Sequence, residues 1–146
     1  MLTDQDIPRN GRLLAVDFGE SRIGLALTDE LQITAQAFKT IFIRQTLKEG
    51  VREIAEVCKE KEVKGIILGN PVLMSGIAGE MTERTKKFAD QLRAKIKTPI
   101  TFFDERLTSL QAERHLKDIG KKNLKSKGEV DRLAAAFILR SFLDCR

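Results

Sequence analysis

The sequence contains no tryptophan and no tyrosine, and His115 is its only histidine. We therefore do not expect a histidine-based nucleophile relay or a histidine-rich metal site. All the aromatic residues are phenylalanines, most of them on apolar stripes, so we do not expect a platform on which single-stranded bases stack. The two cysteines, Cys58 and Cys145, form no CxxC pair, which favours neither a disulfide framework nor a zinc site and fits a reducing cytoplasm.

Long apolar runs and nucleotide-binding glycine motifs are also missing. No apolar stretch approaches the ~20 residues that cross a bilayer, so we expect neither membrane insertion nor secretion. The glycines follow neither GxGxxG nor GxxxxGK[ST], which excludes the Rossmann and P-loop motifs. What remains is a chain of 146 residues, 42% apolar and 32% charged, with the size and composition of one folded domain.

Short apolar runs and helical periodicities alternate along this chain. The expected elements are strands at 13–16, 23–27 and within 35–43, a helix from 47, a strand at 63–68, a helix over 81–96, a strand at 100–103, and helices at 108–119 and 130–142. Because parallel strands need helical crossovers, this order predicts an α/β fold with a mixed five-stranded sheet, three antiparallel strands followed by βα units, flanked by helices. We expect residues 1–11 to be a flexible segment and residues 12–146 to form a single domain.

The chain is basic, with a net charge of +5 and a pI near 9.4. Most of the excess lies between Arg106 and Arg132. A local basic excess attracts polyanions, so we expect this stretch to hold a nucleic-acid backbone, although charge alone does not distinguish it from a solvated, lysine-rich loop. The candidate phosphate-binding residues there are Arg106, Lys121, Lys122, Lys125 and Lys127.

Three acidic residues fall at the edges of expected elements. Asp17 closes an apolar strand, Glu105 lies just past another strand, and Asp131 falls at the start of the last helix. If they converge, the carboxylates repel one another unless a cation intervenes, and their natural partner is Mg²⁺ or Mn²⁺. Two such ions would support phosphodiester hydrolysis by water. Taken singly, each acid also has a structural explanation as a turn residue, an ion-pair partner or a helix-start residue.

Glycines and a polar turn residue mark places where a phosphate could approach the backbone. Asn70, in the Gly69-Asn70-Pro71 turn, could contact a phosphate together with nearby backbone amides. Gly19 and Gly24 fit close approach by a ligand, although a tight hairpin explains Gly19 as well. We therefore add Gly19 and Asn70 to the candidate nucleic-acid-binding residues.

Four segments of the chain resemble, in order, the motifs of the YqgF (RuvX) family. They are residues 14–26 with LAVDFG and RIGLA, 69–71 with GNP, 104–109 with DERLTS and 130–135 with VDRLAA. The resemblance implies an RNase H-like nuclease domain related to the RuvC Holliday-junction resolvases. It also implies a bacterial cytoplasmic enzyme of ribosome biogenesis that processes the 5′ end of pre-16S rRNA, with ribosomal precursor particles as further partners.

The same resemblance implies roles for individual residues. The catalytic and metal-binding carboxylates of the family fall on Asp17, Glu105 and Asp131, with Asp104 as a supporting ligand. The chain departs from the family at Asn70, where a leucine is expected, and near Met74, where an acid is expected. These departures concern the loop on the substrate side and leave the three carboxylates unchanged.

Other functions remain open on the sequence alone. A DNA resolvase of the Holliday-junction type would use the same carboxylates and would need a symmetric dimer to cut two strands together, and the sequence leaves open whether the chain is a monomer or a homodimer. A nucleic-acid-binding factor without catalytic activity would use only the basic residues. The segment Asp17-Phe18-Gly19 also resembles the first phosphate loop of actin-like and sugar-kinase ATPases. Those enzymes need a second domain, for which this chain is too short.

Overall fold

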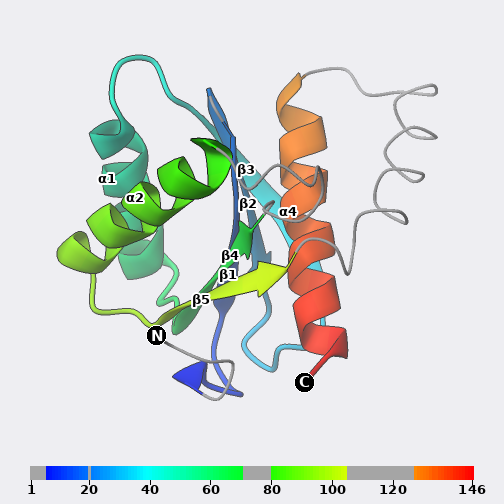
Figure 1. Cartoon of the computed structure of the whole chain (residues 1–146). Helices are drawn as coiled ribbons and strands as arrows, with labels where there is room; N and C mark the ends of the chain where they lie inside the picture. Colours follow the sequence, from blue (N-terminus) through cyan, green and yellow to red (C-terminus); the bar gives the residue numbers. More distant parts are fainter. Residues whose placement is uncertain (1–5, 20, 71–79, 105–126) are drawn as a thin grey trace.

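The computed structural model describes residues 6–19, 21–70, 80–104 and 127–146, which form a five-stranded sheet with helices on both faces (Figure 1). The strands are β1 (Leu13–Phe18), β2 (Arg22–Thr28), β3 (Ala35–Phe42), β4 (Gly65–Asn70) and β5 (Ile100–Asp104), and the helices are α1 (Leu47–Glu60), α2 (Glu80–Lys95) and α4 (Lys127–Asp144). The expected helix at 108–119 lies outside the described residues.

The sheet has the order β3-β2-β1-β4-β5. Strand β2 is antiparallel to both β1 and β3, whereas β4 is parallel to both β1 and β5. This confirms the predicted mixed sheet of three antiparallel strands followed by βα units. The boundaries differ by a few residues: β4 runs from Gly65 to Asn70 rather than from 63 to 68, and α4 begins at Lys127 rather than at 130.

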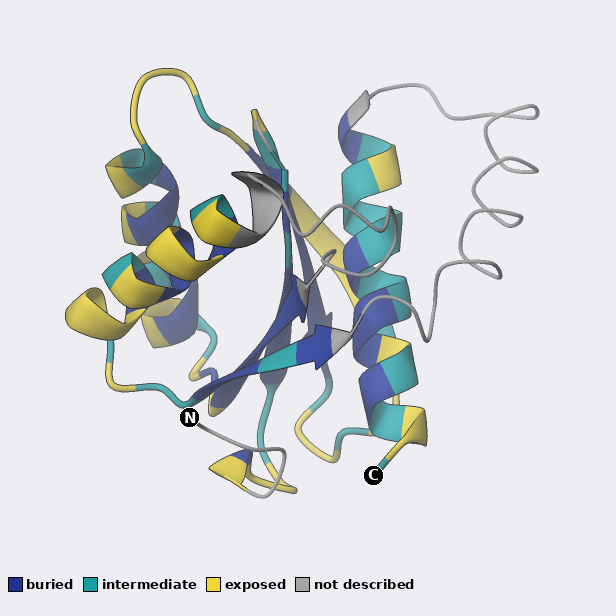
Figure 2. Ribbon diagram, viewed as in Figure 1, coloured by how far each residue is buried: buried dark blue, intermediate teal, exposed yellow. Residues whose placement is uncertain are grey.

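Helices α1 and α2 cover one face of the sheet, and α4 covers the other (Figures 1 and 2). In β1, Leu14 and Val16 belong to the core beneath α1 and α2, while Leu13 and Ala15 belong to the core beneath α4. Strand β1 is therefore buried on both faces, which explains why its apolar run is unbroken up to Asp17.

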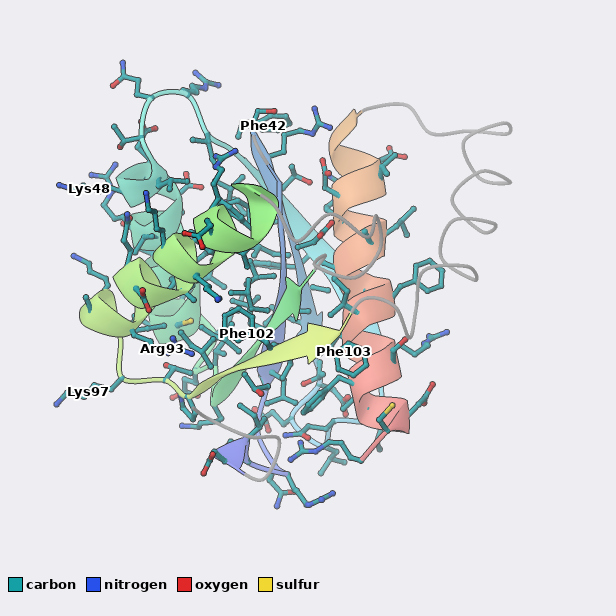
Figure 3. The ribbon with its side chains drawn as sticks, viewed as in Figure 1. Phe42, Lys48, Arg93, Lys97, Phe102 and Phe103 are labelled. Carbon is teal, nitrogen blue, oxygen red and sulfur yellow. The ribbon has the colours of Figure 1, made fainter. Side chains whose placement is uncertain are left out.

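Strand β5 shows the same alternation. The ring of Phe103 meets Phe142 of α4 edge-on at 6.1 Å, whereas the ring of Phe102 lies 5.8 Å from the guanidinium carbon of Arg93 in α2. Figure 3 shows the two rings on opposite sides of the strand. Because side chains alternate between faces at every residue, the residues that share a face with α4 can be read from the register.

Part of the N-terminal segment packs against the domain. Ile7 is buried among residues that pack beneath α4, and the guanidinium of Arg146 donates hydrogen bonds to the carbonyl oxygens of Ile7 and Pro8. The side-chain amide of Gln32 also donates to the carbonyl oxygens of Pro8 and Gly11, at 2.9 and 3.0 Å. One apolar side chain and these bonds thus tie Ile7, Pro8 and Gly11 to the rest of the domain. The flexibility of the N-terminal segment stays a prediction.

Both cysteines are free thiols: Cys58 is buried and Cys145 is exposed. Burial raises the pKa of the Cys58 thiol to about 11. Among the described residues, no helix combines the length and the apolar character that crossing a membrane requires.

Candidate functional site

Asp17 lies at the carboxyl end of β1, on the face covered by α4. This placement follows from alternation, because Leu13 and Ala15 on the same strand pack beneath that helix. The carboxyl ends of the parallel strands β1, β4 and β5 share one edge of the sheet. Ligand sites in sheets of this type collect beyond the carboxyl ends of the strands, so Asp17 has the position expected of a functional residue.

Asp131, in the first part of α4, lies close to the end of β1 that carries Asp17. Gly24 is the β2 partner of Asp17 in the antiparallel ladder, and a Cβ added to Gly24 would overlap the backbone carbonyl group of Asp131. Helix α4 therefore rests directly on the backbone of β2 at this glycine. Cross-strand partners have Cα atoms only about 5 Å apart, so Asp131 lies over the nearest neighbour of Asp17.

This contact changes the interpretation of Gly24. The sequence suggested that Gly24 admits a ligand close to the backbone, but the space beside it is filled by α4. Gly19 serves the β1–β2 hairpin: its N–H donates to the carbonyl oxygen of Arg22 at 2.9 Å, and an added Cβ would lie 2.7 Å from that oxygen. A role for Gly19 in nucleic-acid binding stays a prediction.

An arginine that the sequence analysis did not single out completes the described part of the site. The Nε of Arg22 donates to Oδ2 of Asp131 at 2.6 Å, with side chains that are 32% and 18% exposed. Arg22 lies two residues before Gly24, so it shares the face of the sheet that meets α4. The sequence spacing of Arg22 and Gly24 could have indicated that they share a face of the sheet. Only the position of α4 shows that the acid bound by Arg22 is Asp131.

The first turn of α4 is also tied to β3. The hydroxyl of Thr40 donates to the carbonyl oxygen of Gly128 at 2.6 Å and accepts a hydrogen bond from Nη1 of Arg132 at 3.1 Å. Thr40 is buried and is the β3 partner of Gly24. These bonds hold the start of the helix, and with it Asp131, against the antiparallel strands.

The end of β1 is fixed on the opposite face by an aromatic pair. The rings of Phe18 and Phe88 of α2 are stacked, with centroids 4.4 Å apart, and the guanidinium carbon of Arg84 lies 5.5 Å from the Phe18 centroid. Phe18 is buried. Because Phe18 directly follows Asp17, this packing restricts the backbone that carries the candidate carboxylate.

The other sequence candidates fall at the same edge or outside the described residues. Asn70 is the last residue of β4 and pairs in register with Asp104, the last residue of β5, while Lys127 is the first residue of α4. Residues outside the described part are Glu105, Arg106, Lys121, Lys122 and Lys125. Within residues 6–19, 21–70, 80–104 and 127–146, no group of three potential metal-binding side chains is assembled.

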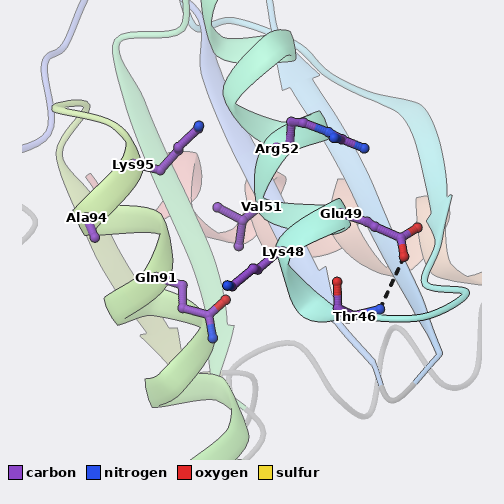
Figure 4. A pocket seen from close by; sticks show the side chains of 8 residues that line it. All are labelled: Thr46, Lys48, Glu49, Val51, Arg52, Gln91, Ala94 and Lys95. Atoms are coloured by element: carbon purple, nitrogen blue, oxygen red, sulfur yellow. Dashed lines mark hydrogen bonds between the residues drawn. The ribbon is translucent and has the colours of Figure 1, made fainter.

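A hollow among the described residues lies elsewhere. It has a volume of about 550 Å³ and lies between α1 and α2, with Lys48, Arg52 and Lys95 in its lining (Figure 4). The capping box of α1 forms its rim, where the backbone N–H of Thr46 donates to Glu49 at 3.2 Å. Since this hollow lies on the face away from α4, it does not contain the carboxylates.

Comparison with known proteins identifies the family. The model of the RuvX family, described as "Holliday junction resolvase", matches residues 11–145. The chain belongs to the RuvX family. Its members include a protein of Syntrophus aciditrophicus (strain SB), which is 42% identical over 133 residues, covering 91% of this chain and 88% of that protein. A protein of Synechococcus sp. is 40% identical over 131 residues, covering 90% and 87%. Both are named "Putative pre-16S rRNA nuclease".

Solved structures confirm the fold of this RuvX family chain. RuvC of Thermus thermophilus aligns with a TM-score of 0.59 at 12% identity, covering 92% of this chain and 96% of RuvC. The large terminase nuclease of phage G20c aligns with a TM-score of 0.55 at 11% identity, covering 92% and 83%. The predicted RNase H-like class is therefore confirmed.

Proposed function

We propose that this chain is a divalent-metal-dependent nuclease that hydrolyses phosphodiester bonds near the 5′ end of pre-16S rRNA, in the cytoplasm. The observation that carries the proposal is the packing of the Asp131 backbone on Gly24, the cross-strand partner of Asp17, at the carboxyl edge of a RuvC-like sheet. The names of the family members support the substrate class.

The donor set suits a hard divalent cation. Asp17 and Asp131 present carboxylates on one face of the sheet, and we assign Glu105, the residue after β5, as the third ligand. Carboxylate oxygens are the ligands that Mg²⁺ and Mn²⁺ prefer, and two bound ions would supply an activated water and charge stabilisation at the leaving oxygen.

The protein residues around these carboxylates have positioning roles. Arg22 engages Oδ2 of Asp131 and offsets the charge of that carboxylate when no ion is bound. Thr40 holds the first turn of α4 in place through Gly128. The proposed phosphate contacts are Gly19, Asn70, Arg106, Lys121, Lys122, Lys125 and Lys127. Since Lys127 opens the helix that carries Asp131, a backbone bound by this basic segment would lie beside the carboxylates.

The decisive experiment compares two substrates with the purified protein. A pre-16S 5′-leader RNA and a four-way DNA junction are each incubated with Mg²⁺, with Mn²⁺ or with a chelator. Cleavage of the RNA alone, and only with metal, is the expected result. Junction cleavage instead would make the chain a DNA resolvase, as the description of its family states. Metal-independent binding without cleavage of either substrate would make it a binding factor.

The Arg22–Asp131 ion pair predicts a change in metal affinity. A metal ion and the Arg22 guanidinium compete for the same carboxylate, so Arg22→Gln is expected to tighten Mn²⁺ binding by about threefold to tenfold. Calorimetric titration of the protein without substrate measures the affinity. Arg22→Lys, which keeps the charge, and Arg93→Gln, which removes a cation bonded to Asp90 outside the site, should both bind Mn²⁺ like the wild type. Weaker binding by Arg22→Gln would show that the arginine orients Asp131 for the ion instead.

A further inference from the structure

Phe42 is an exposed aromatic residue at the rim of the carboxylate site. It is the last residue of β3, and 54% of its surface is exposed, although most of the phenylalanines are buried or half-buried. Figure 3 shows it at the end of the sheet where α4 begins. Phe42 is thus an exception to the expectation that most phenylalanines lie on apolar stripes, from which the sequence predicted no base-stacking platform.

The sheet register places Phe42 on the same face as the carboxylates. Phe42 pairs with Arg22, and two residues away Thr40 pairs with Gly24. Thr40 bonds to α4 and Gly24 lies against it, so alternation puts Phe42 and Arg22 on the α4 face as well. Directly opposed side chains in a sheet have Cβ atoms about 5 Å apart. The Phe42 ring is thus the neighbour of the arginine that binds Asp131.

The backbone that carries the ring is held in place. The N–H of Ile43 donates to the carbonyl oxygen of Ser21 at 2.9 Å, which ties the end of β3 to the β1–β2 hairpin. The Ile43 side chain packs against the core beneath α1 and α2, and Ile41 is buried in that core. Phe42 is thus an exposed side chain between two anchored ones, presented by a fixed segment rather than by a loose loop.

The charges beside the ring suit a nucleic acid. Arg22 lies opposite Phe42 on β2, and Arg44 is exposed two residues further along the chain. An aromatic face next to cations is the arrangement by which proteins hold unpaired bases and their phosphates together. A protein partner added along β3 is less well supported, because the strand has an irregularity opposite Leu25 and Ala26 and carries Lys39 there, both of which discourage pairing at a sheet edge.

We propose that Phe42 is a stacking platform for an unpaired nucleobase next to the scissile phosphodiester, so that the substrate is single-stranded where it enters the site. This rests on the proposed nuclease function and adds to it the class of substrate. A base in a duplex is already stacked on both faces and cannot offer one to the ring without unpairing. The site would therefore prefer a single-stranded segment over a duplex of the same sequence.

A fluorescence measurement tests the contact directly. The chain has no tryptophan, so Phe42→Trp introduces its only indole, and Phe38→Trp places an indole at another exposed aromatic position of β3 as a matched control. Both are made in an Asp17→Asn background with a chelator present, so that the RNA stays intact. A single-stranded RNA of about 12 nucleotides should quench the indole at position 42 and not at position 38, and its duplex should quench neither. Equal quenching at both positions, or by the duplex, would overturn the proposal.

A second measurement uses affinity. Base stacking on an aromatic side chain contributes enough that Phe42→Ala should weaken single-stranded RNA binding by about 5- to 100-fold, while Phe38→Ala leaves it unchanged. Phe42 is half-exposed, so the melting temperature should stay close to that of the wild type. If Phe42→Ala binds single-stranded RNA as tightly as the wild type, the stacking role is rejected. It is also rejected if Phe42→Ala keeps its RNA affinity but no longer associates with a second copy of the chain.

The two proposals fail separately. Selective quenching at position 42 in a protein that cleaves no substrate would retain the stacking platform and reject the nuclease. Metal-dependent RNA cleavage that is equally efficient in Phe42→Ala would retain the nuclease and reject the platform.

Discussion

Asp17→Asn is expected to lower metal-dependent RNA cleavage by on the order of 10³-fold or more while leaving the fold intact. Asparagine keeps the shape of the side chain but removes the charge that a divalent ion requires. Asp17 sits between the buried residues Val16 and Phe18 at the end of a central strand, so its backbone has little freedom to bring another ligand into its place.

Stability should change much less than activity. Asparagine has nearly the shape of aspartate and keeps a side-chain oxygen that accepts hydrogen bonds. Thermal unfolding with a chelator should therefore show a melting temperature for Asp17→Asn close to that of the wild type. Cleavage rates of the two proteins, measured at saturating Mg²⁺, give the catalytic effect.

Asp90→Asn provides the matched control for this charge change. Asp90 is an acid on α2 with a side chain that is 75% exposed, and its described ion pair is a 3.5 Å contact with Arg93. Its neutralisation should leave cleavage unchanged. If Asp17→Asn cleaves RNA as fast as Asp90→Asn does, Asp17 is a structural turn residue and the carboxylate site is not the catalytic one.

The sequence was sufficient for those features that depend on local periodicity. The unbroken apolar run before Asp17 correctly indicated a strand, because a strand buried on both faces has no polar positions until it leaves the core. The order of elements also placed Asp17 at a strand end and Asp131 at a helix start, and an α/β sheet brings such positions to one edge. That the two carboxylates form one site stays a prediction.

Features that depend on how helices and strands pack against one another could not be predicted from the local periodicity of the sequence. The partner of Arg22 is 109 positions away in the sequence and is selected by the position of α4. The exposure of Phe42 reflects its place on an edge strand, where the alternation of apolar residues does not reveal which face is covered. Ile7 was missed because a single apolar residue in a polar segment gives no periodic signal.

Gly24→Ala should have the largest effect on stability among the substitutions at this site. The added methyl group would overlap the carbonyl group of Asp131, which is helix backbone and cannot turn aside as a side chain can. Helix α4 would have to move away from β2, straining the Thr40–Gly128 and Arg22–Asp131 contacts together. Overpacking of this kind costs about 1–3 kcal/mol of unfolding free energy, which urea denaturation measures.

The same displacement should also reduce catalysis, because Asp131 moves with the helix while Asp17 stays on β1. A misplacement of about 1 Å in a catalytic group lowers rates by about 10²-fold, so cleavage by Gly24→Ala should fall even where the protein is fully folded.

Gly50→Ala separates this effect from a general intolerance of glycine replacement. Its added methyl group would meet the flexible end of the Ile23 side chain at 2.8 Å, and alanine is the better helix former in α1 by about 1 kcal/mol. The unfolding free energy of Gly50→Ala should therefore stay near the wild-type value, with normal cleavage. A Gly24→Ala protein as stable and active as Gly50→Ala would mean that α4 does not rest on β2 at Asp131. In that case the two carboxylates would not be held together by the packing of α4 on the sheet.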